Sequence, residues 1–177
     1  LPGYGLRVSS SEVFKVMLKR YLGVPLLGEP STCQLCNGVM DPMGDHALVC
    51  RRGDAKFRRH NDMGLVLTAA ASAAGLTPVP ERRHLLLHGN QRPGDITLAT
   101  GLDNPHTLAY DVSISDTLQQ KTIRNAAAET GFVAKRAFQS KMSKYAVSCS
   151  EAGVRFIPLI WESTGGSSDS VHNVVAE

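Results

Sequence analysis

Four residues that bind soft metal ions stand within eighteen positions of the chain: Cys33, Cys36, His46 and Cys50. The first two are separated by two residues, a spacing that lets two thiolates hold one side of a tetrahedral ion. The histidine and the last cysteine form a second pair, and Asn37-Gly38 supplies the tight turn that follows such a knuckle. Because four ligands leave no open position, the pattern predicts a structural zinc ion.

Disulfide bonds are the alternative for these thiols. The segment holds an odd number of cysteines, and the fourth, Cys149, is far away in a stretch that reads as helix. Nothing in the sequence marks the chain as secreted, which disfavours disulfides. The spacing therefore favours zinc over disulfides or unliganded thiols, and Cys149 is expected to be a buried helix residue.

Two aspartates form a second candidate site. Asp95 follows Arg92-Pro-Gly, and Asp111 lies in Tyr-Asp-Val-Ser-Ile, so each stands at the edge of a short apolar segment. Burying a carboxylate there is costly unless a cation compensates it, and two carboxylates on neighbouring strands repel each other unless a divalent ion lies between them. Oxygen ligands suit magnesium or manganese, which favour phosphodiester hydrolysis. A turn or capping role is the alternative for each aspartate.

Two lysines could supply the cation that phosphodiester cleavage also requires. Lys141 and Lys144 are three residues apart, on one face of an expected helix, with Tyr145 beside the second lysine. Such lysines could orient the attacking water or stabilise the charge of the phosphate. The alternative is a solvated helix face.

Basic residues are clustered although the net charge is only +3. The first cluster is opposed by a single acid, Asp54, and consists of Arg51, Arg52, Lys56, Arg58 and Arg59. The second consists of Lys135, Arg136, Lys141 and Lys144. Both clusters suit contacts with phosphate groups, or else form solvated helix faces.

The elements that must position these residues follow from periodicity and turn signals. A helix is expected over 9–26, capped by one of Ser9, Ser10 or Ser11, then a loop-built unit over 27–50, and a second helix over 54–74. The expected strands cover 76–79, 84–87, 95–99, 108–114 and 154–161, with a helical stretch over 122–149 that breaks near Gly131 and a mobile tail over 165–170. This order predicts an α/β domain with one mixed sheet.

Composition agrees with a folded protein. The chain has 177 residues, of which 42% are hydrophobic and 20% charged, enough for one domain with a small appendage. There is no apolar run long enough to cross a bilayer, so no membrane association is expected. The opening segment has no secretory signal, and a first residue other than Met suggests a piece of a longer protein.

The ordered set of motifs resembles a known family. The cysteine–histidine segment is followed by Arg-rich sequence, Arg-Pro-x-Asp, Asp-Val-Ser, Lys-x-x-Lys-Tyr and Gly153-Val-Arg-Phe-Ile-Pro-Leu-Ile. This order looks like the C-terminal region of site-specific non-LTR retrotransposon proteins, where a CCHC zinc knuckle precedes a restriction-like endonuclease of the PD-(D/E)XK superfamily. The resemblance covers about residues 33–166. It implies a restriction-endonuclease-like mixed β-sheet flanked by helices, with an N-terminal helix at 1–26, the zinc knuckle at 27–53 and the nuclease domain at 54–177.

The resemblance also implies roles for individual residues. Asp95 and Asp111, with the Val112 carbonyl, would hold one or two magnesium or manganese ions. The superfamily lysine normally stands two residues after the second acid, where this chain has Ser113, so the resemblance places the lysine on the following helix, at Lys141 in preference to Lys144. A second departure is Gly94, which separates Pro93 from Asp95.

Further contacts follow from the same resemblance. His60 would touch the scissile phosphate or the water beside the metal, or would be a helix histidine that is only hydrogen-bonded in place. Tyr145, Arg92 and the Arg51–Arg59 cluster would contact nucleic acid.

The implied activity is nicking or staggered cleavage of DNA that leaves a 3′-hydroxyl to prime reverse transcription. DNA is the implied partner, the RNA of the parent element a second one, and the nucleus the implied location; the oligomeric state stays open. The alternatives are a nucleic-acid-binding module in which the aspartates are structural, a nuclease specific for branched DNA in the manner of junction resolvases, and a domain that binds a protein partner.

Overall fold

The computed structural model describes residues 10–50, 52–86, 92–99 and 107–176, and the chain divides into two compact units. Unit 1 is Leu1–Gly53 and unit 2 is Asp54–Glu177. The expected strand end at Leu87 and the basic residue Arg51 lie outside the described residues.

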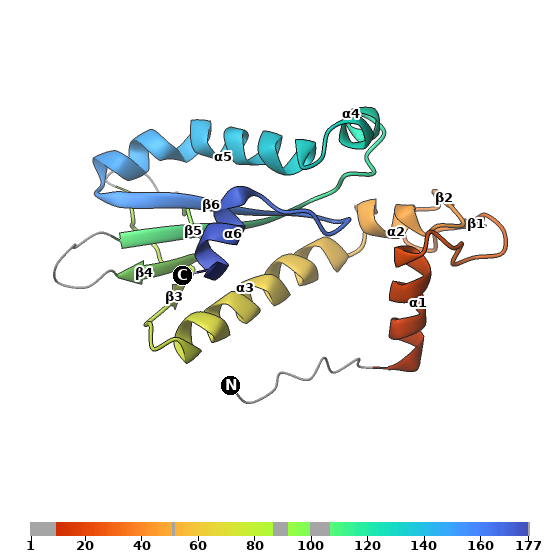
Figure 1. Cartoon of the computed structure of the whole chain (residues 1–177), viewed down its shortest axis with the longest axis horizontal. Helices are drawn as coiled ribbons and strands as arrows, with labels where there is room; N and C mark the ends of the chain where they lie inside the picture. Colours follow the sequence, from red (N-terminus) through yellow and green to blue (C-terminus); the bar gives the residue numbers. More distant parts are fainter. Residues whose placement is uncertain (1–9, 51, 87–91, 100–106, 177) are drawn as a thin grey trace. The chain divides into compact units, whose positions relative to one another are not determined.

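Unit 1 begins with helix α1, Ser11–Tyr21 (Figure 1). Ser10 caps the helix: its hydroxyl accepts a hydrogen bond from the Val13 N–H at 3.2 Å, and the candidate Ser9 lies outside the described residues. The helix is shorter than the expected 9–26 because the chain turns at Gly23 and Pro25 and leaves helical geometry there.

The cysteine-rich segment is more regular than the expected loop-built unit. Strands β1 (Ser31–Thr32) and β2 (Val39–Met40) pair as an antiparallel hairpin, and helix α2 covers Asp45–Val49. Each of these elements is too short to show a periodic pattern of apolar residues, so a loop was expected from the sequence.

Unit 2 is built around a mixed sheet, as predicted, with four strands among the described residues where five were expected. Its strands are β3 (Val79–Pro80), β4 (Ile96–Ala99), β5 (Thr107–Ser115) and β6 (Val154–Glu162), in the order β3-β4-β5-β6. The first three strands pair antiparallel, whereas β5 and β6 are parallel. The parallel step needs a crossover, which helices α4 (Ile123–Ala128) and α5 (Phe132–Glu151) supply.

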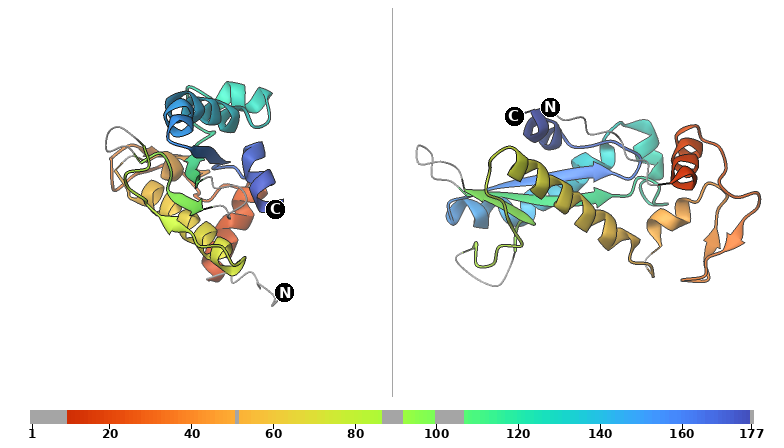
Figure 2. Two further views of the ribbon diagram at one scale, coloured as in Figure 1. Left: turned by 90° about the vertical axis from the view of Figure 1, so that its left-hand side faces the viewer. Right: turned by 90° about the horizontal axis from the view of Figure 1, so that it is seen from below.

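Helices cover both faces of this sheet (Figures 1 and 2). On one face, α5 packs through Met142, Tyr145 and Cys149 against Ala109 and Phe156. On the other face, helices α3 (Ala55–Ala73) and α6 (Asp169–Ala176) pack against a second apolar cluster: Ile96, Leu98, Tyr110 and Leu159. Neighbouring residues of β5 thus point to opposite faces, which fixes which helix each side chain meets.

Two predicted strands differ from the structure. The expected strand 76–79 contributes only Val79–Pro80, because prolines at 78 and 80 have no N–H for a ladder. The expected strand 84–87 is absent from residues 84–86: Glu81 and His84 have left-handed backbones, with φ of 49° and 57°, and this bends the chain away from the sheet.

The structure agrees with the predicted helix break but not with the predicted mobile C-terminal tail. Gly131 separates α4 from α5 as expected, with a φ of 72° that glycine tolerates without strain. The tail expected to be mobile over 165–170 is instead tied to β6: Ser168 Oγ accepts the Ile160 N–H at 3.2 Å, α6 starts at Asp169, and Val171 is buried. No helix within the described ranges combines the length and the apolar character that a bilayer crossing requires.

Candidate metal centres

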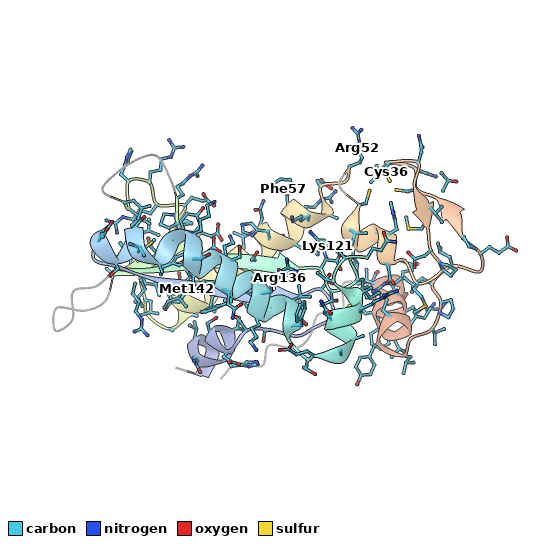
Figure 3. All side chains as sticks on the ribbon, turned by 90° about the horizontal axis from the view of Figure 1, so that it is seen from above. Cys36, Arg52, Phe57, Lys121, Arg136 and Met142 are labelled. Carbon is cyan, nitrogen blue, oxygen red and sulfur yellow. The ribbon has the colours of Figure 1, made fainter. Side chains whose placement is uncertain are left out.

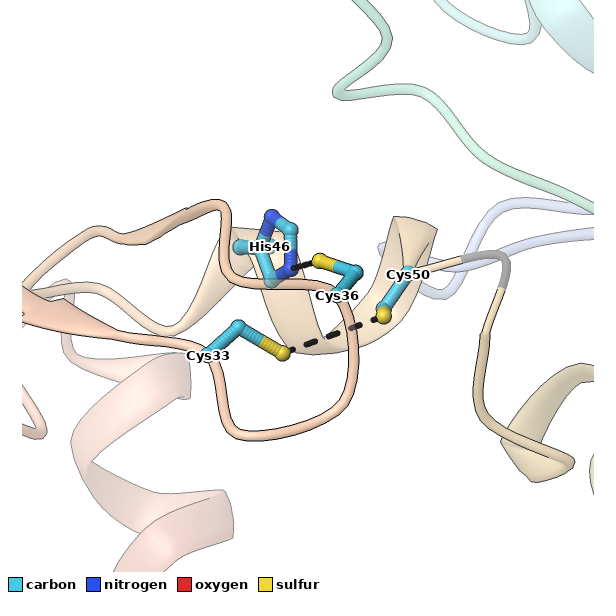
Figure 4. A group of neighbouring side chains, drawn as sticks. All are labelled: Cys33, Cys36, His46 and Cys50. Carbon is cyan, nitrogen blue, oxygen red and sulfur yellow. Dashed lines mark hydrogen bonds between the residues drawn. The ribbon is translucent and has the colours of Figure 1, made fainter.

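The four predicted zinc ligands lie together in unit 1 (Figure 4). Their ligand atoms are all within 4.8 Å of one another, with 3.9 Å between the sulfurs of Cys33 and Cys50 and 3.1 Å between Cys36 Sγ and His46 Nε2. Tetrahedral zinc separates two sulfur ligands by about 3.8 Å and a sulfur from a nitrogen by about 3.6 Å. The cluster could therefore hold a zinc ion after small side-chain adjustments, and no cysteine is in a disulfide.

Local structure explains how the four ligands meet. The turn at Asn37, with a φ of 59°, folds the chain back so that Cys33 and Gly38 pair through their backbones at 2.8 Å. Helix α2 carries His46 and ends at Cys50. The knuckle supplies one pair of ligands and the helix the other.

Two residues that the sequence did not single out hold α2 in position. The Asp41 carboxylate accepts the N–H groups of Asp45 at 3.0 Å and His46 at 2.8 Å. Arg20 of α1 donates to the Met43 carbonyl at 2.6 Å and forms an ion pair with Asp45 at 3.1 Å. An acidic residue just before a short helix is the sequence signal that could have revealed Asp41.

The electrostatics of the knuckle favour a bound cation. The N–H groups of Leu35 and Cys36 lower the pKa of the Cys33 thiol to about 6, so this sulfur is a thiolate at neutral pH. The Gly38 N–H favours the Cys36 thiolate too, but burial and the neighbouring Cys33 and Cys50 sulfurs raise its pKa. Crowded sulfur ligands that raise one another's pKa are stabilised as thiolates when a metal ion binds.

In unit 2 Asp95 directly precedes β4, and Asp111 lies in the neighbouring antiparallel strand β5. The pairing places Ile96 of β4 opposite Tyr110 of β5, and the Asp95 N–H donates to the Tyr110 carbonyl at 2.8 Å. Asp95 therefore stands next to Asp111, with its Oδ2 accepting the Val112 N–H at 2.7 Å. The structure brings the two carboxylates together.

Asp111 is the most constrained ionisable group of this site. Its side chain points to the α5 face of the sheet, where Lys141 Nζ lies 3.0 Å from Oδ1 and 2.8 Å from Oδ2. Burial raises the pKa of Asp111, Lys141 opposes that rise, and the Asp95 charge adds to it. Oδ2 is buried, and its 2.8 Å contact with the Lys141 ammonium is an ion pair without hydrogen-bond geometry, so this oxygen could also bind a divalent cation.

His60 approaches the same carboxylates from α3. Its Nε2 lies 3.4 Å from Asp95 Oδ1, and about a third of its side chain is exposed. Helices from both sides of the sheet thus contribute a nitrogen to the aspartate pair, Lys141 from α5 and His60 from α3.

Lys144 and Tyr145 do not join the carboxylates directly. The ammonium of Lys144 lies 4.7 Å from the centre of the Tyr145 ring, and hydrogen bonding to Tyr145 raises the pKa of this lysine, with a smaller contribution from the Asp111 charge. The tyrosine ring packs edge-on against Phe156 at 5.4 Å. The structure therefore separates the two lysines: Lys141 faces the carboxylates and Lys144 is exposed.

The other predicted contact residues among those described are exposed, except Arg59, which is half-buried. Arg52 and Lys56 are exposed, Arg58 forms an ion pair with Asp54 at 2.6 Å, and Arg59 donates to the Ala55 carbonyl at 3.4 Å. Arg92 forms an ion pair with Glu81 at 2.7 Å. Their contact with nucleic acid stays a prediction.

Gly94 has a steric reason to stand between Pro93 and Asp95. A Cβ at this position would lie 3.0 Å from the Ala109 Cβ and 3.1 Å from the Tyr110 carbonyl oxygen. Only glycine lets the chain pass this close to β5 while Asp95 pairs with it. The inserted glycine therefore positions the first carboxylate.

We expect Gly94→Ala to lower the free energy of unfolding by about 1–3 kcal/mol, because β4 must move away from β5. Gly64→Ala is the matched control, since nothing lies within 4 Å of an added Cβ there and α3 should gain roughly 0.5–1 kcal/mol. Urea unfolding of both variants measures the difference. A Gly94→Ala protein as stable as the wild type would contradict this account of the glycine.

Comparison with protein-family models and with curated proteins gives no match to this chain. The mixed sheet packed by helices and the Cys3His cluster therefore stand on the structure itself.

Proposed function

We propose that unit 2 is a divalent-metal-dependent endonuclease that cuts DNA, of the restriction-like kind that the motif order resembles. The observation that carries the proposal is the buried Asp111, which lies next to Asp95 and forms an ion pair with Lys141. Burying one carboxylate beside a second one is costly, because their negative charges repel each other. A cation between the two carboxylates removes that repulsion.

The residues present fit magnesium or manganese. Asp95 and Asp111, with the Val112 carbonyl, are the proposed oxygen ligands, a donor set that suits hard cations. When bound, such an ion neutralises charge on the phosphodiester and lowers the pKa of water. The Val112 N–H holds Asp95 in place through its 2.7 Å hydrogen bond, so this carboxylate is oriented before any ligand arrives.

Lys141 and His60 supply the proposed polar groups around the reacting phosphate. Lys141 lies against Asp111 with about a third of its side chain exposed, so its ammonium can reach the attacking water or the negative charge that develops on the phosphate. His60 is exposed to a similar extent on the other side of Asp95 and can donate a hydrogen bond to the same phosphate or water. Lys144, which is exposed, is proposed to contact a neighbouring phosphate.

Unit 1 would serve this activity as a structural zinc module. Four ligands leave no position for a substrate, so we assign the ion no catalytic role. The residues that we propose to contact phosphates of the duplex are Arg51, Arg52, Lys56, Arg58, Arg59, Arg92 and Tyr145. In the retroelement setting that the motifs resemble, the 3′-hydroxyl left by nicking would prime reverse transcription of the element's RNA in the nucleus.

Plasmid nicking by the purified chain tests the proposal. We expect supercoiled plasmid to be converted to open circles with magnesium or manganese and to stay intact in EDTA. Asp95→Asn should abolish the reaction, whereas Asp54→Asn, a change of the same kind at an exposed aspartate, should not. Metal-independent nicking, or full activity of Asp95→Asn, would sink the endonuclease proposal; DNA binding without cleavage would point to a binding module.

A further inference from the structure

From Phe132 to Ser150, the side of α5 that faces away from the sheet carries positive charge and no carboxylate, and the helix ends with the acid Glu151. Between Phe132 and Ser150 the helix contains four cations and no acid. One cation, Lys141, points inward to Asp111, and the rest are exposed. We call the following exposed residues the outer face of α5: Lys135, Arg136, Gln139, Ser140, Ser143 and Lys144.

Helix stability does not account for this arrangement. Lys135 and Arg136 stand near the first turn, where the positive end of the helix dipole makes cations unfavourable by a few tenths of a kcal/mol. A helix face built only for solvation alternates Glu with Lys at four-residue spacing, and the outer face does not. Two carboxylates act at this end: Glu129 pairs with Lys135 at 3.3 Å, and Glu162 accepts the Ala134 N–H at 2.9 Å.

The excess charge is carried by Arg136 and Lys144. Within the described residues neither of them forms an ion pair with a carboxylate. Figure 3 looks onto α5 from outside the sheet and shows Arg136 on the helix, with Lys121, another exposed cation, near the helix start. Exposed cations whose charge is not balanced by a carboxylate of the protein are suited to a polyanion.

The uncharged residues of the outer face fit the same ligand. Ser140 and Ser143 are small, so they allow a strand to approach closely, and their hydroxyls can donate to phosphate oxygens. Ser143 Oγ donates to the Ser140 carbonyl in the absence of a ligand. Lys144 stands one turn after Lys141, so the outer face ends beside the aspartate pair.

We propose that the outer face of α5 binds the sugar–phosphate backbone of duplex DNA and leads one strand along the helix to Asp95 and Asp111. The purpose of this path rests on the proposed endonuclease function, whereas the binding itself does not require cleavage. The contacts are made to phosphates, so they are independent of base sequence. They should show the salt dependence of counterion release.

Binding to a labelled duplex of about 30 base pairs, measured in EDTA so that no cleavage occurs, tests the surface. Each lost phosphate contact lowers the slope of log K against log salt by about 0.9, which is roughly an eightfold loss of affinity at 0.1 M salt. We expect Arg136→Gln to show both the smaller salt dependence and the roughly eightfold loss of affinity. Gln139→Glu should weaken binding at least as much, although its new carboxylate can pair with Lys135 and Arg136 and should not destabilise the helix.

Ala69→Glu is the matched control, because it adds the same charge at an exposed position of α3, on the opposite face of the sheet. We expect it to bind within about twofold of the wild type. Equal binding by the wild type, Arg136→Gln and Gln139→Glu, or an absence of duplex binding by the wild type at low salt, would overturn the inference. If these two variants bind weakly while the wild type never nicks plasmid, the α5 surface stands and the endonuclease proposal fails.

Discussion

Removing the metal is expected to unfold the cysteine-rich segment of unit 1 and to leave unit 2 folded. Among the described residues of unit 1, Cys33 is the one buried hydrophobic side chain, and the apolar residues of α1 are exposed. A segment without a core cannot offset the entropy of ordering its chain, which is about 1–2 kcal/mol per residue. Zinc bound by a Cys3His site contributes about 10–16 kcal/mol, and this binding free energy acts as folding free energy for the segment.

Metal analysis and circular dichroism measure this prediction. We expect one zinc per chain, lost on chelation together with the structured signal of residues 27–50, and lost equally in Cys36→Ser. Cys149→Ser is the matched control: this thiol is buried in α5, where burial raises its pKa to about 11, so the change should weaken unit 2 and leave the zinc content unaltered. A Cys36→Ser protein that keeps stoichiometric zinc would rule out the Cys3His assignment.

The Asp111–Lys141 pair should separate stability from activity. Asp111→Asn is expected to reduce nicking about a thousandfold or more, because one ligand of the metal is lost. Lys141→Met is expected to reduce it by a factor on the order of 10²–10³, the usual effect of removing a group that stabilises developing charge. Neither loss should be recovered in the double variant.

The two single variants should differ in thermal stability, although both lose nicking activity. Burial raises the pKa of Asp111, so its contribution to stability is fully present below the unfolded-state pKa and is lost as pH rises through the higher folded-state value. At neutral pH without divalent metal, Asp111→Asn should therefore melt above the wild type. Lys141→Met should melt below it and have a free energy of unfolding lower by about 2 kcal/mol, because a mostly buried carboxylate is left without its cation.

The double variant is the decisive measurement for this pair. Without either charge the site has no unpaired ion, so its melting temperature should return to that of the wild type or above while nicking stays lost. Lys135→Gln is the matched control for the melting temperature alone, since this lysine of the same helix is exposed and its ion pair with Glu129 is worth little. A double variant that nicks normally would show that the pair is structural alone.

The sequence by itself determined the features that depend on neighbours in the chain. The spacing of Cys33, Cys36, His46 and Cys50 is local, and the knuckle and α2 bring these four ligands within reach of one ion. Gly131 divides the crossover helices because its left-handed backbone is a local property. The long strands β5 and β6 follow from short segments rich in β-branched, aromatic and other apolar residues that lie between turn signals.

Only the tertiary structure decided how the aspartate site is assembled. The pairing of β4 with β5 makes neighbours of Asp95 and Asp111, and a shift of one residue would have placed them on opposite faces. Lys141 rather than Lys144 meets Asp111 because of the rotation of α5 on the sheet, which spacing along the chain does not specify. His60 comes from the helix on the other face, and the bend at His84 removes an expected strand. Register, helix rotation and packing across a sheet depend on contacts between residues far apart in sequence, and these contacts are set by the whole core.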